Sequence, residues 1–345
     1  MGNIERYDFI DVAKGIGIIT VVIIHCFWFS HTPSLSKFGR LICYIYTMPL
    51  FFTVSGIFYR ESDSFLTFCK KKANKLLIPF VSFYLISYIA AFLKSAFLGD
   101  EFDFLSIKRV LQEWIPGSNG AIWFLICLFI CSLSFYGIHN IANRSHFKLA
   151  VITVLSAAIG ACGFYFGINK INLPFWIDSA MTAIPFFTFG FILKNRLNFF
   201  ECQTKRHLNL AVSIVLLIIC GLYGKQYVLG TNTFGDNSIF SFYISCFCGV
   251  IAILLLSKNL SWCKFLSYLG KNSLIILITH QLLLYLFVNR IIVIVAEYAG
   301  SLGSVVSSLS VLFMALLFIA SYFILIPMLS KIAPYSCARK NLIKL

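Results

Sequence analysis

Apolar runs of membrane-spanning length follow one another along almost the whole chain of 345 residues. A helix that crosses a bilayer needs about 20 mostly apolar residues, and ten segments have this character. Charged residues make up only 12% of the sequence, whereas a soluble domain has about 25%. The sequence therefore predicts an all-α integral membrane protein with about ten transmembrane helices. These are expected at residues 10–30, 38–58, 76–98, 120–141, 148–168, 178–194, 207–223, 238–257, 272–289 and 304–329.

Little sequence remains between these segments for a second folding unit. We therefore expect a single transmembrane domain over residues 1–345, with no fused soluble domain. The first apolar run is longer than the 7–15 residues of a signal-peptide core, and no small-residue cleavage site follows it. We expect no cleavable signal peptide.

The formal net charge of +15 is unevenly spread over the connections between the apolar segments. Most of the 28 Lys and Arg residues fall in alternate connections, on the side that includes both chain ends. Because cytoplasmic loops carry the excess of basic residues, we expect cytoplasmic N- and C-termini in a multi-pass protein of the cell membrane. Its basic loops would meet anionic membrane lipid. No helix-turn-helix, RRM or zinc-finger spacing is present, so nucleic acid is not an expected partner.

Twelve cysteines are scattered through the apolar segments without the paired spacing of a zinc site. Cys127 and Cys131 lie four residues apart within one apolar run, and Cys246 and Cys248 flank Phe247 within another. Small apolar packing residues explain this distribution, and we expect no bound metal.

The first apolar segment contains three ionisable residues, Asp11, Lys14 and His25. At 100° per residue, Lys14 and His25 lie on one helix face, separated by roughly 16 Å along the axis. Lys14 alone is compatible with snorkelling to the interface, and Asp11 with a favourable position near a helix N-terminus. His25 has no headgroup within reach at mid-bilayer, and an ionisable residue at that depth indicates function. Asp11 is about 21 Å from His25 along the helix, so we expect it to pair with Lys14 instead.

A second histidine, His280, lies at a similar depth, roughly 13 Å from the inner edge of the ninth segment. Two imidazoles at this depth suggest one shared site. A hydrogen bond between helices through His280, Gln281 or Thr279 is the structural alternative.

The connection from Arg60 to Lys75 is the densest basic run of the sequence and includes Lys70, Lys71 and Lys72. A lysine cluster just inside a membrane helix often meets only anionic lipid. The same lysines could equally bind the phosphates of a cytoplasmic cofactor, and the spacing of the lysines alone leaves both interpretations open.

Four stretches of the chain resemble the acyltransferase 3 family of multi-spanning membrane O-acyltransferases. RYDFIDVAKGIGIITVVIIH, which begins at residue 6, resembles the family's first helix, where Asp, Lys or Arg, and His follow the spacing of Asp11, Lys14 and His25. The other three are MPLFFTVSGIFY at 48–59, KKKANKLLIPF at 70–80 and AIWFL at 121–125. The sequence looks most similar to the fucose 4-O-acetylase-like branch and to intercellular-adhesion polysaccharide O-succinyltransferases. Lys stands at 14, 72 and 75 in place of the commoner Arg, which keeps the charge but loses the bidentate fork.

On the donor side, the resemblance implies that a cytoplasmic acyl-CoA is the co-substrate. Acetyl-CoA is the first expectation, a succinyl donor is possible, and no cofactor is expected to be held tightly. Lys72, Lys75, Lys71 and Lys14 would hold its charged parts. His25 would be the catalytic group, together with Lys14 and Asp11, either as a general base or as an acylated nucleophile.

On the acceptor side, the resemblance implies a hydroxyl of a cell-surface glycan or lipid-linked saccharide. Trp123, Glu113, Asn119 and His280 are the candidate substrate-binding residues. The alternative function is an exporter or flippase of a lipid-linked saccharide or exopolysaccharide, because polar residues along one helix also line transport paths. Transporters often contain repeats with matching broken helices, and the sequence shows none. A polysaccharide polymerase is a weaker alternative, since the longest outer loop is only about 20 residues.

Overall fold

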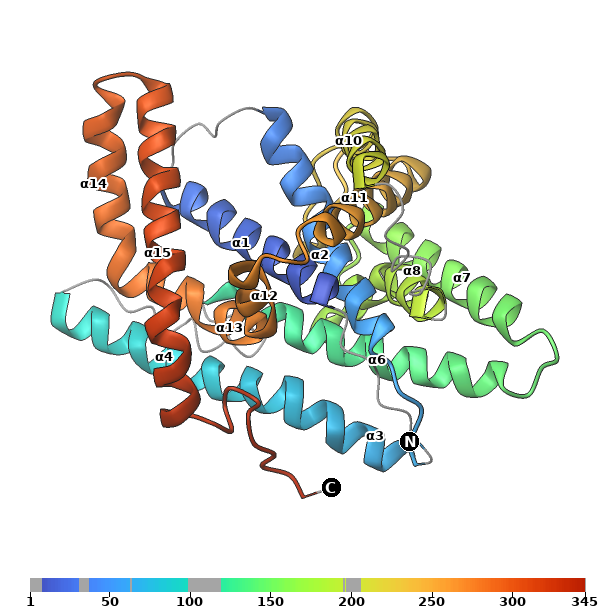
Figure 1. The fold of residues 1–345 in the computed structure, drawn as a ribbon. Helices are drawn as coiled ribbons and strands as arrows, with labels where there is room; N and C mark the ends of the chain where they lie inside the picture. Colours follow the sequence, from blue (N-terminus) through green and yellow to red (C-terminus); the bar gives the residue numbers. More distant parts are fainter. Residues whose placement is uncertain are drawn as a thin grey trace.

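The computed structural model describes residues 8–30, 37–62, 64–98, 119–194, 196 and 206–344, and helices dominate these residues (Figure 1). The first half of the described chain contains α1 (Asp8–Ser30), α2 (Lys37–Ile57), α3 (Phe65–Lys72), α4 (Ile78–Leu98), α6 (Trp123–Ala142) and α7 (Lys148–Ile168). The second half contains α8 (Ile177–Lys194), α10 (Arg206–Tyr223), α11 (Ile239–Asn259), α12 (Lys264–Lys271), α13 (Ser273–Leu283), α14 (Asn289–Gly300) and α15 (Ser304–Ile332).

The expectation of an all-α multi-span membrane protein is confirmed. Among the described residues, nine helices are long and apolar enough to cross a membrane. The expected segment at 38–58 corresponds to α2, a helix of 21 residues whose apolar part is found at Tyr44–Ile57. All ten expected segments are therefore helical, and α7 begins and ends at the expected residues.

Two helices extend well beyond the expected boundaries. The segment expected to begin at 76 begins at Phe65, because α3 continues through a π-helical turn, η1 (Ala73–Leu77), into α4. The basic residues at 70–75 thus lie on a helix and not in a loop, and neither Gly nor Pro interrupts the sequence from Phe65 to Ile78. A second π-helical turn, η5 (Leu284–Val288), joins α13 to α14, so this span continues to Gly300.

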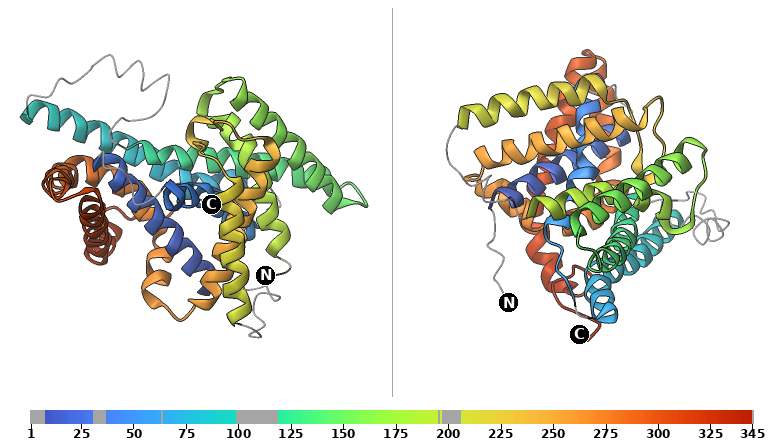
Figure 2. Two further views of the ribbon diagram at one scale, coloured as in Figure 1. Left: turned by 90° about the horizontal axis from the view of Figure 1, so that it is seen from above. Right: turned by 90° about the vertical axis from the view of Figure 1, so that its right-hand side faces the viewer.

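The helix α1 lies near the middle of the assembly and contacts α2, α11, α12, α13, α14 and α15 (Figure 1). The pair α14 and α15 and the helix α7 lie on opposite sides of the molecule (Figure 2). The outer helices α7, α10 and α15 leave most of their apolar residues unburied within the protein. Such surfaces suit a lipid environment, in which apolar side chains need no protein cover.

Glycines allow two helix pairs to approach closely. A Cβ at Gly270 in α12 would lie 1.7 Å from the carbonyl oxygen of Asp11 in α1, and one at Gly15 would lie 2.1 Å from the carbonyl oxygen of Leu266. Gly56 in α2 and Gly190 in α8 form an equivalent contact, as small residues commonly do between membrane helices. The first of these contacts presses α12 against the first turns of α1, where Asp11 and Lys14 are located.

Candidate active site

The two intramembrane histidines expected to share a site are in direct contact. Nε2 of His280 lies 3.2 Å from Nδ1 of His25, and the ring centroids are 4.9 Å apart. His280 is completely buried, whereas His25 retains partial exposure. The pair joins α1 to α13 and lies near the end of α1, five residues before Ser30, and seven residues after the start of α13.

Backbone carbonyl groups determine which ring nitrogen carries hydrogen in each histidine. Nδ1 of His280 lies 2.9 Å from the carbonyl oxygens of both Ile276 and Leu277, and Nδ1 of His25 lies 2.8 Å from that of Val21. Because a carbonyl oxygen only accepts, both Nδ1 atoms are assigned as N–H donors. His25 then shares its proton between Val21 and Nε2 of His280. The lone pair of the neutral His25 ring is consequently placed on Nε2, the atom available for proton transfer.

The expected pairing of Asp11 with Lys14 is present at the start of α1. The Lys14 Nζ lies 2.7 Å from a carboxylate oxygen of Asp11, one helical turn earlier. Lys14 also lies 5.9 Å from the centre of the Phe58 ring, which contributes a cation–π contact. Asp11 is nearly buried, so this ion pair fixes the position of the ammonium group at the end of α1.

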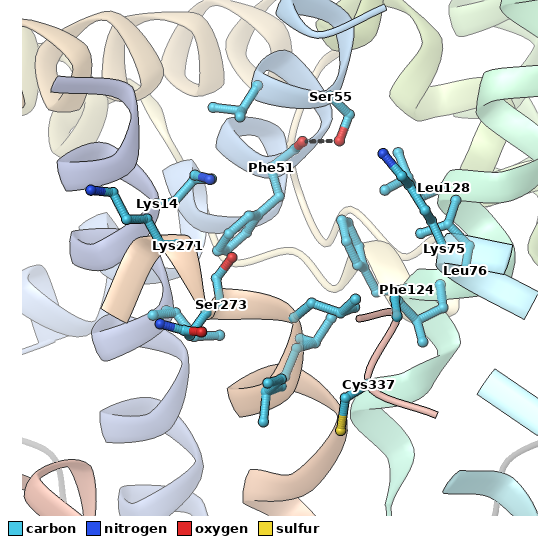
Figure 3. A pocket seen from close by; sticks show the side chains of 18 of the residues that line it. Lys14, Phe51, Ser55, Lys75, Leu76, Phe124, Leu128, Lys271, Ser273 and Cys337 are labelled. Atoms are coloured by element: carbon cyan, nitrogen blue, oxygen red, sulfur yellow. Dashed lines mark hydrogen bonds between the residues drawn. The ribbon is translucent and has the colours of Figure 1, made fainter. Parts of the chain in front are cut away.

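A cavity of about 410 Å³ opens beside Lys14 and is lined by five basic side chains. Figure 3 shows Lys14 and Lys271 on one side of it and Lys75 on the other. Lys72 and Arg339 complete the basic set, and no acidic residue is found among the described residues that line the cavity. Such a concentration of positive charge favours a ligand with several negative charges.

The lining of this cavity includes residues from each of the two helices that carry the histidine pair. Ile18 and Leu277 both line it. Ile18 precedes His25 by seven residues, or roughly 10 Å along α1, and Leu277 precedes His280 by less than one turn. The basic mouth and the two imidazoles are therefore positioned by the same pair of helices, α1 and α13.

A family comparison gives these features their context. A family model described as an acyltransferase domain matches residues 7–329. The chain belongs to the acyltransferase 3 family. Membership identifies it as a membrane acyltransferase in general terms, and the matched region includes Lys14, His25 and His280. Comparison with curated proteins and with solved structures gave no match.

In this acyltransferase 3 chain, the predicted donor-side residues are placed unequally. Lys14, Lys72 and Lys75 line the cavity, whereas Lys71 is exposed and does not line it. The Lys72 Nζ lies 5.5 Å from the centre of the Phe68 ring and 6.0 Å from that of Phe187, so part of its surface is already covered. Of these four residues, three are thus brought together by the fold.

Sequence reasoning missed two basic residues of the cavity, Lys271 and Arg339. Lys271 ends α12, the short helix held against α1 by the glycine contacts. Arg339 follows α15, beyond the region that matches the acyltransferase model. Lys271 lies in a connection whose basic residues already indicated a cytoplasmic position, and this was the sequence signal that could have suggested it as a donor-side residue. No local pattern distinguishes Arg339 from the other basic residues near it.

The described acceptor-side residues, Asn119, Trp123 and His280, do not line the basic cavity. Asn119 is fully buried, and its Nδ2 donates to the carbonyl oxygen of Ile278 at 2.8 Å and to Oγ of Ser87 at 3.1 Å. Trp123 is half-buried and packs against Gly230. Glu113 lies outside the described residues. Asn119 therefore holds the turn of α13 that carries His280, a positioning contact that the sequence did not indicate.

Hydrogen bonds between helices, the structural alternative for this region, are present beside the histidine pair. Oε1 of Gln281 accepts from the backbone N–H of Ala121 at 2.6 Å, and the hydroxyls of Thr279 and Tyr322 lie 2.9 Å apart. Within the described residues, the hydrogen-bond partners of the His280 ring are His25 and carbonyl groups of its own helix. Its neighbours thus fix α13 in place, while its own Nε2 faces His25.

Two other polar residues of the cavity wall have ordinary structural partners. Oγ of Ser55 donates to the carbonyl oxygen of Phe51 at 2.8 Å (Figure 3). The Cys337 thiol donates to the carbonyl oxygen of Leu329 at 3.8 Å, and burial raises its pKa, although nearby Arg339 acts in the opposite direction. A protonated thiol is a poor nucleophile, so His25 remains the stronger candidate for the reacting group.

Proposed function

We propose that this chain is a membrane O-acyltransferase that uses a cytoplasmic acyl-CoA as donor. The acceptor is a hydroxyl of a cell-surface glycan or lipid-linked saccharide, and acetyl is the first candidate for the acyl group, with succinyl as the second. Family membership supports acyl transfer in general. The donor proposal rests on one observation, the cavity with five basic side chains that is lined in part by α1 and α13, the two helices that carry the histidine pair.

The dimensions of the site are compatible with this donor. A cavity of about 410 Å³ lies within the usual range of ligand sites, and it suits the phosphorylated nucleotide end of an acyl-CoA. The pantetheine arm then has to cover the distance from Lys14 to His25, roughly 16 Å along α1. This length is comparable to that of the extended arm, so the thioester arrives near the histidines.

The proposed step uses Nε2 of His25 as a general base. Nε2 accepts the proton of the acceptor hydroxyl while the hydroxyl oxygen bonds to the thioester carbonyl carbon. The carbon–sulfur bond then breaks, and the departing thiolate takes the proton from the His25 imidazolium. The products are an ester and the free thiol of CoA. General base catalysis of this kind contributes typically 10²–10⁴-fold.

His280 has a positioning role in this proposal. Its Nε2 accepts from Nδ1 of His25, which holds the ring in the tautomer whose lone pair is on Nε2. The imidazolium that forms during the step keeps its Nδ1–H and gains a second N–H at Nε2. The same lone pair would attack the thioester if His25 were acylated first, so both chemical routes use this orientation.

The deciding experiment measures acyl transfer by purified protein in lipid nanodiscs. Radiolabelled acetyl-CoA and succinyl-CoA are each supplied with a panel of free and lipid-linked glycans, with the wild type compared to His25→Ala. His207→Ala is the matched control, because it removes an exposed histidine at the start of α10. We expect label on a glycan with the wild type and with His207→Ala, and its loss with His25→Ala.

Two further outcomes carry information. Label retained on the protein in the absence of acceptor would replace the general base by an acylated His25. A wild-type protein that neither binds CoA nor transfers label, but moves a lipid-linked saccharide across vesicles, would overturn the enzyme proposal in favour of transport.

A further inference from the structure

The segment after α15 folds back onto the basic cavity. We call residues 333–344 the C-terminal strap. The backbone N–H groups of Arg339 and Lys340 both donate to the carbonyl oxygen of Pro334, at 2.8 and 3.1 Å, and that of Cys337 donates to Ala333 at 3.0 Å. These bonds make a compact turn. Figure 1 shows the strap, in red, running from the end of α15 toward α3.

A single buried asparagine fastens the far end of the strap. Oδ1 of Asn74 accepts from the backbone N–H groups of Leu342 and Ile343, at 2.9 and 2.8 Å. Its Nδ2 donates to the carbonyl oxygen of Ile343 at 2.8 Å and to that of Lys70 at 3.1 Å. Asn74 is 2% exposed and lies in η1, between Lys72 and Lys75. The helix that carries two of the cavity lysines is therefore tied directly to the strap.

The middle of the strap forms part of the cavity wall. Cys337, Ala338 and Arg339 all line it. The guanidinium of Arg339 donates to Oδ1 of Asn272, and its Nε lies 3.4 Å from Oγ of Ser330. No carboxylate pairs with Arg339 among the described residues. Because a guanidinium has five N–H donors, it keeps unused donors as well as an uncompensated charge at the cavity.

Arg339 differs chemically from the other basic groups of the site. The four remaining cations of the described lining are lysines, which act as point charges. A guanidinium binds phosphate through two parallel N–H···O bonds, which gives geometric selectivity. The strap thus brings the single planar phosphate-binding group of this lining to a cavity that already favours multiply charged anions.

We propose that the C-terminal strap completes the donor site, with Arg339 as a specificity-determining residue that binds a phosphate of the nucleotide end of acyl-CoA. Asn74 is the positioning residue that holds the strap in place. This inference rests on the proposed function, because it assumes an acyl-CoA donor. It adds a discrimination that the lysines do not supply, between a full CoA and a carrier that has only the phosphopantetheine arm.

The test compares ligand binding by wild-type protein and by Arg339→Gln in nanodiscs, with calorimetry on CoA and on 4′-phosphopantetheine. Lys340→Gln is the matched control, because it removes the positive charge next to Arg339 in the strap, and Lys340 does not line the cavity. We expect Arg339→Gln to raise the Kd for CoA about tenfold, in line with a hydrogen bond to a charged group. Lys340→Gln should change it by less than about twofold. Phosphopantetheine, which lacks the nucleotide, should bind wild type and Arg339→Gln equally.

A second variant tests the positioning role of Asn74. Asn74→Ala removes the bonds to Leu342 and Ile343, so hydrogen exchange at these two amides should become fast. Its Kd for CoA should rise as in Arg339→Gln, and the double variant should lose little more, because both changes act through one guanidinium. If Asn74→Ala fails to fold, the Arg339→Gln variant still tests whether the strap contributes to CoA binding, because Arg339 is exposed and its substitution should leave the fold intact.

The outcomes separate this inference from the proposed function. CoA binding that is lost in Lys75→Gln and unchanged in Arg339→Gln overturns the role of the strap and leaves the acyl-CoA donor intact. An equal loss of affinity in Arg339→Gln and Lys340→Gln also overturns it, because bulk charge would then explain the effect. A wild-type protein that binds no CoA overturns both.

Discussion

Nδ1 of His25 and Nε2 of His280 lie 3.2 Å apart, although 255 residues separate them in the chain. This contact places the two histidines in unequal roles, because only His25 has its second ring nitrogen available for chemistry. His280 has its Nδ1 directed to backbone carbonyls and its Nε2 directed to His25. Substitution of the two residues should therefore have unequal effects.

We expect His25→Ala to lower acyl transfer by about 10²–10⁴-fold, the usual contribution of a general base. His280→Ala should cause a smaller loss, on the order of tenfold, because His25 keeps its bond to Val21. The KM for acyl-CoA should stay near its wild-type value in both variants. Steady-state kinetics in nanodiscs give both constants. A His280→Ala variant as inactive as His25→Ala would contradict the positioning role.

The basic helix 65–77 allows a comparison between two lysines that are four residues apart. Lys75→Gln should raise the KM for acyl-CoA about tenfold, because Lys75 lines the cavity and a charged hydrogen bond is worth that much. Lys71→Gln should leave KM unchanged within about twofold, because Lys71 is exposed away from the cavity. Equal effects would mean that the charge of the whole segment, and not the geometry of the cavity, determines affinity.

The contact between α1 and α12 should be intolerant of even one added methyl group. In Gly270→Ala the new Cβ would meet the carbonyl oxygen of Asp11 at 1.7 Å, so the helices have to move apart. Overpacking of this kind costs about 1–3 kcal/mol, and it should displace Lys271 from the cavity lining and weaken CoA binding. Gly137→Ala is the control, since nothing lies within 4 Å of its added Cβ. Thermal unfolding of the two purified variants measures the difference, and equal midpoints would contradict the contact.

Orientation in the membrane remains a prediction from the distribution of charge. A reporter active only in the cytoplasm should be active when fused after residue 344 and inactive when fused after residue 172, in the turn between α7 and α8. Reporter activity on whole cells provides the measurement. The opposite pattern would place the basic cavity on the outer side and exclude a cytoplasmic acyl-CoA as its ligand.

The expected helices are present because each one is specified by a continuous run of apolar residues in the sequence. About 20 apolar residues specify a spanning helix regardless of what packs beside it. Lys14 and His25 are likewise placed by the geometry of one helix, and the depth of His280 was sufficient to suggest a common site. Each of these inferences needs information from a single segment only.

Other parts of the site depend on contacts that no single segment encodes. Asn74 gives no local sign that its partners are Leu342 and Ile343, and Arg339 looks like any other basic residue near a chain end. The helix α12 is eight residues long, too short to be read from an apolar run. The π-helical turn η1 also escaped prediction, since its sequence is compatible with an ordinary helix.

The strap has a consequence for the order of events during synthesis. Asn74 and Ile343 are 269 residues apart, so the asparagine is inserted long before its partner has been translated. Until then the amide of Asn74 lacks its main partners and one wall of the cavity is missing. The histidine pair and the residues that hold α13 in place, including Tyr322 of α15, all precede residue 333, so the pair can form while the donor pocket is still incomplete. The donor pocket is therefore completed only after residues 333–344 have been translated, much later than the helix 65–77 that carries Lys72 and Lys75.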